Sequence, residues 1–457
     1  MSRLRLFVVT TSLALTALFA QTARADRYNV PPGSSWETLA PKLKPGDEVV
    51  LAQGVHQPAV LTGVSGAPFA PIVIRSLGPN QLAEIAADRE SIKLVDCRHI
   101  RIERILSRSP RRAGILIEST KPGASMDITI EDTLIVGPKG LAEESGIVAR
   151  GVKELAIRRC RIENPKNTAI TIADCDAVTM ADIQVVARTD LSPNVAVRLE
   201  GRVWSTLIER MQIAGPFATA FEFGTLEGTS VSAPASNSTS NSTSNSTSNP
   251  TSNSTSTPTS TPTSTTRTNA DASPTSGTDA STPTQGAPKN NTANDLAKDG
   301  TAATPQTSRE PLVRFLTINN IRITGVRRLL DVGSVADTSV RNITLSDAHE
   351  EIYRIALPPA GRPSAALRMS ECLITWVPGA LRRIGVVAEG ANAKGFVLGG
   401  NLWWSPELPA ALSLLGDAGQ PFPGTIETPQ TVDVDPKLDL RSLPTAEIAK
   451  AYGYTPG

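Results

Sequence analysis

The stretches HIRIERILS (99–107), DITIEDTLI (127–135), LAIRRCRIE (155–163) and VTMADIQVV (178–186) share one pattern. Apolar or small residues tend to fall at positions i, i+2, i+5 and i+7, counted from a first residue that we call the anchor. An i, i+2 pair is typical of a short strand with alternating faces, and the residues before i+5 form a corner that leads into a second strand. The expected anchors are Ile100, Ile128, Leu155, Val178, Thr206, Leu316, Ile343, Leu367 and Phe396.

The spacing of the anchors predicts the fold. Successive anchors lie about 23 to 29 residues apart, except for a step of about 110 residues from Thr206 to Leu316. Short strands, sharp corners and a period in the twenties predict a parallel β-helix, an all-β solenoid. Leucine-rich repeats have a similar period, but their L-x-x-L-x-L-x-x-N framework is missing. A further apolar pair after each anchor predicts a third strand: Ile115/Ile117, Ile147/Ala149, Ile170/Ile172, Val197/Leu199, Phe221/Phe223, Leu330/Val332, Ile355/Leu357 and Ile384/Val386.

The long step is explained by an insertion at residues 229–310, which includes a run of almost pure Ser, Thr, Asn and Pro. With few apolar side chains this segment cannot offset its ordering entropy by burial, and we expect it to be disordered. It would act as a flexible spacer or, through Asn-X-Ser/Thr triplets such as those at Asn237 and Asn241, as a glycosylated or adhesive stalk. The insertion therefore interrupts one repeat array rather than separating unlike domains.

The first residues are expected to direct export. Arg3 and Arg5 precede an apolar run over 6–20, and Ala23-Arg24-Ala25 offers small residues for cleavage. This pattern predicts a signal peptide and a protein that is secreted, periplasmic or on the cell surface. A membrane anchor is the alternative, but the run is shorter than the roughly 20 residues needed to span a bilayer, and no later segment reaches that length.

The expected organisation follows from these features. Because an open β-helix exposes core and strand edges, both ends need caps, and Trp36 to Leu43 predicts a short capping helix. The expected parts are a signal peptide (1–25), the N-terminal part of the β-helix with its cap (26–228), the disordered insertion (229–310), the C-terminal part of the β-helix (311–404) and a C-terminal cap or tail (405–457).

Composition excludes some functions. The chain has 457 residues with 45 Lys and Arg against 44 Asp and Glu, which argues against nucleic-acid binding by bulk charge. Three histidines and no C-x-x-C argue against a His-rich metal site or a zinc or redox site. The repeat register keeps the four cysteines too far apart to pair, so we expect free thiols in the core: Cys97, Cys160, Cys175 and Cys372.

The residue before i+5 alternates in charge from coil to coil, which predicts a structural ladder of ion pairs. Its members are Arg104, Asp132, Arg159, Asp182 and Arg210.

The segment 33–76 resembles the start of secreted right-handed β-helix proteins of the pectate-lyase-like superfamily, closest to chondroitinase B and alginate lyases. The shared features are the capping helix, the turn Pro45-Gly46-Asp47, the strand end with Gly54 and His56, and the strand 71–76. The ending 435–444 is also similar. The resemblance implies right-handed coiling and, for such lyases, a base that removes a proton beside a uronate carboxylate, often with Ca²⁺. The Lys and Arg pair and the calcium carboxylates of the family have no recognisable counterparts here.

A candidate glycan groove lies on the outward positions of the third strand. Four of these residues should lie on consecutive coils, where a mixed column would hold an anionic sugar with an arginine as base; a charge ladder on a solvated face is the alternative. The candidates are Arg150, Arg198, Glu200, Glu222, Asp331 and Arg354.

Two function classes follow. The first is a polysaccharide lyase-like enzyme that acts on an acidic glycan by β-elimination, with Ca²⁺ implied only by the resemblance. The second is a non-catalytic cell-surface or envelope β-helix that binds glycan or protein. In either class the partner is a polysaccharide or cell-envelope glycan, with no nucleic acid and no transmembrane helix after signal cleavage, and we expect a monomer.

Overall fold

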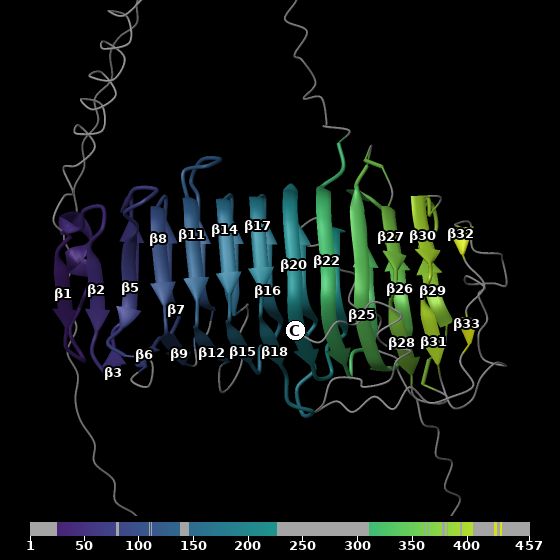
Figure 1. Cartoon of the computed structure of the whole chain (residues 1–457), viewed down its shortest axis with the longest axis horizontal. Helices are drawn as coiled ribbons and strands as arrows, with labels where there is room; N and C mark the ends of the chain where they lie inside the picture. The colour runs from purple at the N-terminus through teal and green to yellow at the C-terminus, as the bar shows by residue number, and fades with distance from the viewer. Residues whose placement is uncertain are drawn as a thin grey trace, which may run out of the picture. The chain divides into compact units, whose positions relative to one another are not determined.

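The structure is a computed structural model in which almost every strand belongs to a stacked coil (Figure 1). It describes residues 25–78, 82–108, 110, 112–137, 146–225, 310–360, 362–363, 365–376, 380–381, 383–393, 395–404, 425–426 and 430–431.

Each coil contributes strands to three rows, and each strand pairs in parallel with the strand above and below it in its row. Row 1 contains β1 (Arg27–Val30), β2 (Glu48–Leu51), β5 (Ile72–Ser76), β8 (Arg98–Glu103), β11 (Met126–Glu131), β14 (Lys153–Arg158), β17 (Asp176–Ala181), β20 (Val203–Ala214), β22 (Val313–Thr324), β24 (Val335–Ala336), β25 (Thr338–Ala348), β27 (Ala366–Ser370), β30 (Gly395–Gly399) and β32 (Thr425–Ile426).

Row 2 follows row 1 after a corner, and the long strands β20, β22 and β25 pass through both rows. Row 2 otherwise contains β3 (Gly54–His56), β6 (Ala83–Ala86), β9 (Ile105–Arg108), β12 (Leu134–Val136), β15 (Arg161–Glu163), β18 (Gln184–Val186), β28 (Leu373–Trp376), β31 (Leu402–Trp404) and β33 (Gln430–Thr431).

Row 3 is a separate ten-stranded sheet. The three rows enclose the apolar core and make a right-handed parallel β-helix, as expected from the repeat and the resemblance. Row 3 contains β4 (Ala59–Thr62), β7 (Glu90–Val95), β10 (Ala113–Glu118), β13 (Ile147–Arg150), β16 (Thr168–Ala173), β19 (Val195–Glu200), β21 (Thr219–Thr225), β23 (Arg328–Val332), β26 (Glu351–Ile355) and β29 (Arg383–Val387).

The register confirms that the repeat array continues across the insertion. Thr206 of β20 pairs with Leu316 of β22, and Phe221 of β21 pairs with Leu330 of β23, as if the residues between them were absent. The expected disordered segment 229–310 lies outside the described residues except for Glu310. The predicted signal peptide, up to residue 24, and most of the predicted C-terminal cap lie outside them as well.

One predicted anchor was wrong. Ile343 pairs with Ile321, which holds the i+5 position of its coil, and the anchor of the Ile343 coil is Thr338, which pairs with Leu367. The polar anchor and the unbroken strand β25 concealed the corner at Asn342, which has a left-handed φ of 53°.

The third-strand pair Ile355/Leu357 was also displaced. Val332 pairs with Ile355, so Tyr353 and Ile355 are the inward pair, and Leu357 is 60% exposed. In the next coil the offset is one residue in the opposite direction, because Tyr353 pairs with Gly385 and Ile355 pairs with Val387, one residue after the predicted Ile384 and Val386.

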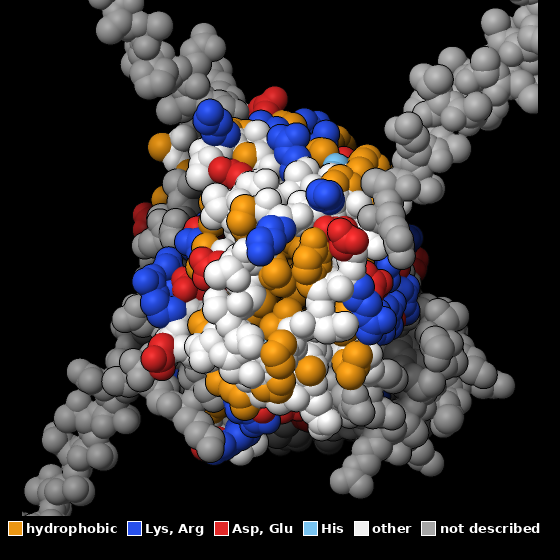
Figure 2. All heavy atoms as spheres, turned by 90° about the vertical axis from the view of Figure 1, so that its left-hand side faces the viewer, with side chains coloured by type: hydrophobic (Ala, Val, Ile, Leu, Met, Phe, Trp, Pro, Cys, Tyr) orange, Lys and Arg blue, Asp and Glu red, His pale blue; other side chains and the backbone are white. Residues whose placement is uncertain are grey.

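The N-terminal end carries the expected cap, as a 3-10 helix, η1 (Glu37–Lys42). Pro41 lies inside η1, and the amides of Leu39 and Leu43 donate to the carbonyls three residues before them, those of Trp36 and Ala40, as in a 3-10 helix. The buried Trp36 ring fixes η1 on the core, and its Nε1 donates to the Gln57 carbonyl at 2.9 Å. Figure 2 shows hydrophobic side chains in the middle of this end, with charged side chains around them.

The motifs behind the resemblance have structural roles. Asp47 is buried, and its carboxylate accepts the backbone amides of Asp26 and Lys44, each at 2.8 Å. Gly46 has a φ of 91° and Gly54 a φ of 130°, conformations that L side chains rarely adopt. His56 is buried and its Nε2 contacts the Ala52 carbonyl at 2.7 Å. These residues therefore explain the fold and not an activity.

All four cysteines are buried and none forms a disulfide, as the register predicted. Burial raises the pKa of the Cys160 and Cys175 thiols to about 12, so neither forms the reactive thiolate at neutral pH.

Ellman's reagent should therefore label none of the cysteines in the folded protein. All four, the full count in the sequence, should react once the protein is unfolded in guanidinium chloride. Absorbance at about 412 nm measures the released thiolate. Rapid labelling of the folded protein would contradict the burial of these side chains.

Replacing residues 226–309 with a Gly-Ser-Gly-Ser linker should leave the fold intact. Two residues join β19 to β20 in the preceding coil, and two join β23 to β24 in the following one, so four linker residues plus 310–312 are enough to connect β21 to β22. We expect the same far-UV circular dichroism and a thermal midpoint within about 4 °C of the parent.

The matched control is Ile208→Pro in β20, which should lower the midpoint strongly because proline removes a ladder hydrogen bond. A loss of β-signal in the linker variant itself would show that the insertion is needed for folding.

Candidate functional site

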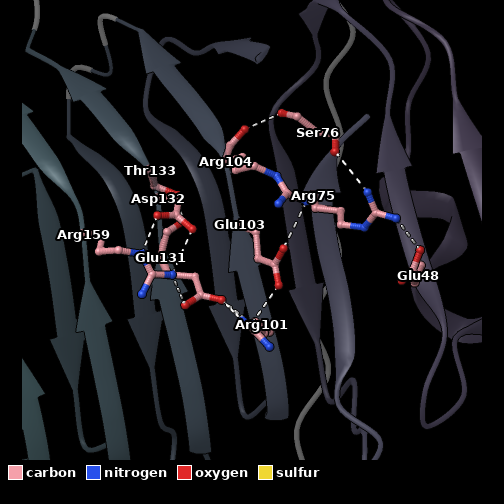
Figure 3. Close-up of polar contacts among 10 residues, drawn as sticks. All are labelled: Glu48, Arg75, Ser76, Arg101, Glu103, Arg104, Glu131, Asp132, Thr133 and Arg159. Atoms are coloured by element: carbon pink, nitrogen blue, oxygen red, sulfur yellow. Dashed lines mark hydrogen bonds and ion pairs between the residues drawn. The ribbon is translucent and has the colours of Figure 1, made fainter. Parts of the chain in front are cut away.

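The expected charge ladder lies at the corner between rows 1 and 2. Arg159 Nε donates to Asp132 Oδ1 at 2.6 Å, and Arg210 Nε donates to Asp182 Oδ1 at 2.8 Å (Figure 3 shows the first pair). All four residues have a left-handed φ near 50°, which is costly for arginine, and the ion pairs help to hold that conformation. The carboxylates of this ladder are bound by arginines and stabilise the corner of the fold.

A buried carboxylate extends the ladder towards the N-terminal end. Glu131 accepts hydrogen bonds from Arg101 and from Arg159, the latter at 2.7 Å (Figure 3). In the next coils, Arg75 pairs with Glu48 at 2.8 Å. The hydrogen bond from Arg159 lowers the pKa of Asp132, so the Asp132 carboxylate is ionised at neutral pH and is bound to Arg159.

The outer face of row 3 brings four of the predicted site residues together. Arg198 pairs in register with Glu222, Glu222 with Asp331, and Asp331 with Arg354. The predicted column on consecutive coils is confirmed. It ends at Thr171 on one side, next to Arg198, and at Val386 on the other, next to Arg354.

Two further charged residues join this column, and strict alternation could not find them. Leu329 and Leu330 are adjacent, yet both are buried in the core, so the residue before them, Arg328, falls on the same face as Asp331. Ile352 and Tyr353 do the same in the next coil and bring Glu351 outward. An apolar doublet with a charged residue on each side was the only signal for this bend in the sequence.

We call the six residues together the row 3 charge cluster. Arg328 contacts Asp331 Oδ2 at 3.2 Å and also binds Glu351. Arg354 lies 3.8 Å from Asp331 Oδ2 and 3.5 Å from Glu351 Oε1. The cluster consists of Arg198, Glu222, Arg328, Asp331, Glu351 and Arg354, and Arg198 Nη2 donates to Glu222 Oε2 at 3.0 Å.

Asp331 has the most unusual electrostatics in the cluster. Burial raises its pKa to about 6, and the nearby carboxylates of Glu222 and Glu351 add to the rise. The guanidinium groups of Arg328 and Arg354 oppose it. Both arginines contact Oδ2, and no hydrogen bond to Oδ1 is found within the described part of the chain. A carboxyl group that titrates near neutral pH is suited to take up or release a proton.

The other two predicted site residues lie on a second outer column. Arg150 and Glu200 both flank Ala173, so they sit two coils apart, and Arg150 lies 4.0 Å from Glu118 rather than beside the cluster. Glu118 also pairs with Lys93 at 2.7 Å. The structure therefore brings neither Arg150 nor Glu200 into the column of the other four candidates.

The calcium implied by the resemblance has no matching donor set in the described residues. They contain no group of three or more His, Cys, Asp or Glu side chains that would hold a metal ion. The carboxylates of the row 3 charge cluster are bound by arginines instead. His99 is engaged by Asp127 at 2.8 Å.

The comparisons with known proteins concern the fold. No family model matches the sequence, and no curated protein matches it significantly. Among solved structures, an alginate lyase from Paenibacillus sp. has 12% identity and a TM-score of 0.47, covering 88% of this chain and 99% of its own. An exopolygalacturonase from Thermotoga maritima has 9% identity and a TM-score of 0.46, covering 83% and 88%.

A lacto-N-biosidase from Eubacterium ramulus has 10% identity and a TM-score of 0.44, covering 83% of this chain and 67% of its own. The fold implied by the resemblance in residues 33–76 agrees with the stacked parallel coils of this chain itself. Likeness at this level does not assign chemistry. No helix among the described residues is long and apolar enough to cross a bilayer.

The replacement Asp331→Asn should remove a loss of folding stability that depends on pH. Because the pKa is about 6 in the folded protein and 3.8 for an aspartate free of such surroundings, the folded protein loses up to about 3 kcal/mol of stability from this residue as the pH rises from about 4 to about 6. The free energy of unfolding of the parent minus that of the variant should fall across this window, as measured by urea titration.

The control is Asp132→Asn, for which the sign is opposite. The pKa of Asp132 is lowered in the fold, so its contribution is present above the unfolded value and is lost as the pH falls below about 4. A parent-minus-Asp331→Asn difference that is flat between pH values of about 4 and 6 would contradict the raised pKa.

Proposed function

We propose that this protein is an exported enzyme that cleaves an acidic polysaccharide by β-elimination at the row 3 charge cluster. The observation that carries the proposal is Asp331, a carboxyl group with a pKa of about 6 that lies between two arginine side chains on an outer sheet face. Export is supported by the predicted signal peptide over residues 1–25, which would place the protein outside the cell, in the periplasm or on the cell surface.

The proposed chemistry needs a base and a cation close together. In β-elimination a base removes the proton from the carbon beside the uronate carboxylate, and the electron pair forms a double bond as the glycosidic C–O bond breaks. The leaving oxygen takes up a proton from water, so the products are an unsaturated uronate and a free hydroxyl group. Positive charge next to the carboxylate stabilises the enolate-like intermediate. A guanidinium group binds a carboxylate through two parallel hydrogen bonds, which suits arginine to this task.

Asp331 is better suited as the base than the arginine expected from the column alone. Arginine keeps its proton in proteins, whereas a carboxyl group with a pKa of about 6 is mostly ionised at neutral pH and is a stronger base than an ordinary aspartate. Arg354 is 26% exposed and Arg198 is 17% exposed, so both guanidinium groups reach the surface where a uronate carboxylate would bind.

The second candidate function is a non-catalytic β-helix that binds glycan or protein. It is favoured by the ion pairs of the cluster, since Arg198 is already bound to Glu222 and Arg328 to Glu351. Such pairing is typical of a structural ladder, and a substrate would have to compete with it. In both cases we propose a glycan partner and a monomeric protein.

The test is the absorbance of unsaturated uronate near 235 nm when the mature protein is mixed with alginate, pectate or glycosaminoglycans in a buffer containing Ca²⁺. Asp331→Asn should lower kcat at least about 100-fold because it removes the base. Arg354→Ala and Arg198→Ala should also lower activity. For the parent, kcat/KM should rise as the pH passes through about 6.

Arg210→Ala is the matched control, because it removes an arginine from the corner ladder and should leave activity within about twofold. New reducing ends without absorbance near 235 nm would identify hydrolysis and overturn the elimination. No cleavage of any of these polymers would favour the binding protein.

A further inference from the structure

Two aromatic–arginine pairs stand on neighbouring coils at the corner where row 3 leads into row 1. The Arg202 guanidinium carbon lies 4.1 Å from the ring centroid of Trp204, and that of Arg314 lies 4.8 Å from the ring centroid of Phe315. Trp204 pairs in register with Arg314, so the two pairs are about one strand spacing, about 4.8 Å, apart. Both distances fall within the range of cation–π contacts.

The fold does not explain why residue 315 is aromatic. Phe315 has a left-handed φ of 54° and is 51% exposed. Bulky side chains are rare in that conformation, and an exposed ring does not stabilise the fold through burial. In six other coils the residue one position before the anchor has the same conformation and is small, polar or charged: His99, Asp127, Glu154, Ala177, Ser205 and Asp337.

Arg202 offers a positive charge that the fold leaves available. It is exposed, and its guanidinium forms no ion pair within the described part of the chain, where its contact is the Trp204 ring. The nearby Asp174 accepts the backbone amide of Arg202 rather than its side chain. Arg314 differs, because its Nε donates to Asp337 at 3.2 Å.

The indole of Trp204 adds an unused donor. Its Nε1 is enclosed, and no acceptor lies within hydrogen-bond distance in the structure described. Tryptophan normally finds a partner for this group when it is buried. An aromatic face and a guanidinium without an ion pair among the described residues therefore meet on one small surface, above an enclosed N–H group.

This surface continues the outer face that carries the row 3 charge cluster. Arg198 of the cluster lies on β19, and only Gly201 and Arg202 separate β19 from β20, where Trp204 is the second residue. The chain from Arg198 to Trp204 therefore spans no more than about 20 Å at the rise of an extended strand. A polysaccharide that lies along β19 and across this corner would contact both places.

We propose that Trp204, Phe315 and Arg202 form a subsite for an acidic pyranose unit of the chain that is cleaved at the row 3 charge cluster. The apolar face of the sugar packs on the aromatic rings, and its carboxylate binds the Arg202 guanidinium. The inference rests on the proposed function for the class of ligand, and it adds a second contact that favours long chains over short ones.

The test is the binding of defined oligogalacturonates and oligomannuronates, two and five units long, to the full mature chain, measured by calorimetry and by tryptophan fluorescence. Arg202→Ala and Phe315→Asn should each weaken pentasaccharide binding about fivefold to tenfold and leave disaccharide binding unchanged. Asparagine removes the ring and tolerates a left-handed φ, so the backbone is preserved. In turnover, KM for the long chains should rise while kcat is unchanged.

Ala177→Asn is the matched control, since it places the same side chain at the same position of another coil, where φ is 56°. Loss of binding in Phe315→Asn but not in Ala177→Asn supports the subsite, even if no polymer is cleaved, in which case only the proposed elimination fails. Unchanged pentasaccharide binding in both Arg202→Ala and Phe315→Asn overturns the subsite, even if Asp331→Asn abolishes cleavage. A change of Trp204 fluorescence on deleting residues 226–309, without any effect of these substitutions on glycan binding, would also overturn it, by showing that the protein's own insertion covers the rings.

Discussion

The backbone ladder between coils is the constraint on which this structure depends. Between the two ends of the described stack, strands hydrogen bond in parallel to strands at the same place in the coils above and below, so each position in the repeat must keep its direction from coil to coil. Inward positions are therefore mostly apolar from Ile100 to Phe396, with Thr206 and Thr338 as buried polar anchors. The corners must also recur, and they do so through residues with a left-handed φ, among them Asn320 and Asn342, which tolerate that conformation well.

The same register determines which charged side chains are neighbours on the surface. Outward residues of successive coils lie about 4.8 Å apart, so charges on neighbouring coils interact whether or not function requires it. At the corner between rows 1 and 2, alternating signs satisfy this requirement, as in the pair of Asp182 and Arg210. In row 3, burial raises the pKa of Asp331 to about 6, and the acidic residue Glu222, its direct neighbour in the column, adds to the rise.

Because the corners are short, the row 3 charge cluster and the aromatic pairs lie near each other along the chain. Two residues suffice to turn from β19 to β20, so the surface that carries Arg198 leads directly to Trp204. Adjacent coils then supply Asp331 and Phe315 from the far side of the insertion. The proposed base and the proposed subsite are therefore built from both parts of the chain, which the uninterrupted ladder brings together.

The sequence by itself determined the repeat, the three-strand coil, the continuity across the insertion, the free cysteines and the column from Arg198 to Arg354. All of these follow from periodicity, because a ladder aligns residues that are one period apart. It misplaced the anchor at Ile343, since Thr338 is polar, and it missed Arg328 and Glu351, since the doublets Leu329-Leu330 and Ile352-Tyr353 break the alternation. Only the tertiary structure decided which charges are buried together and which remain open, because desolvation and ion pairing depend on neighbours that are distant in sequence, such as Thr219 and Arg328.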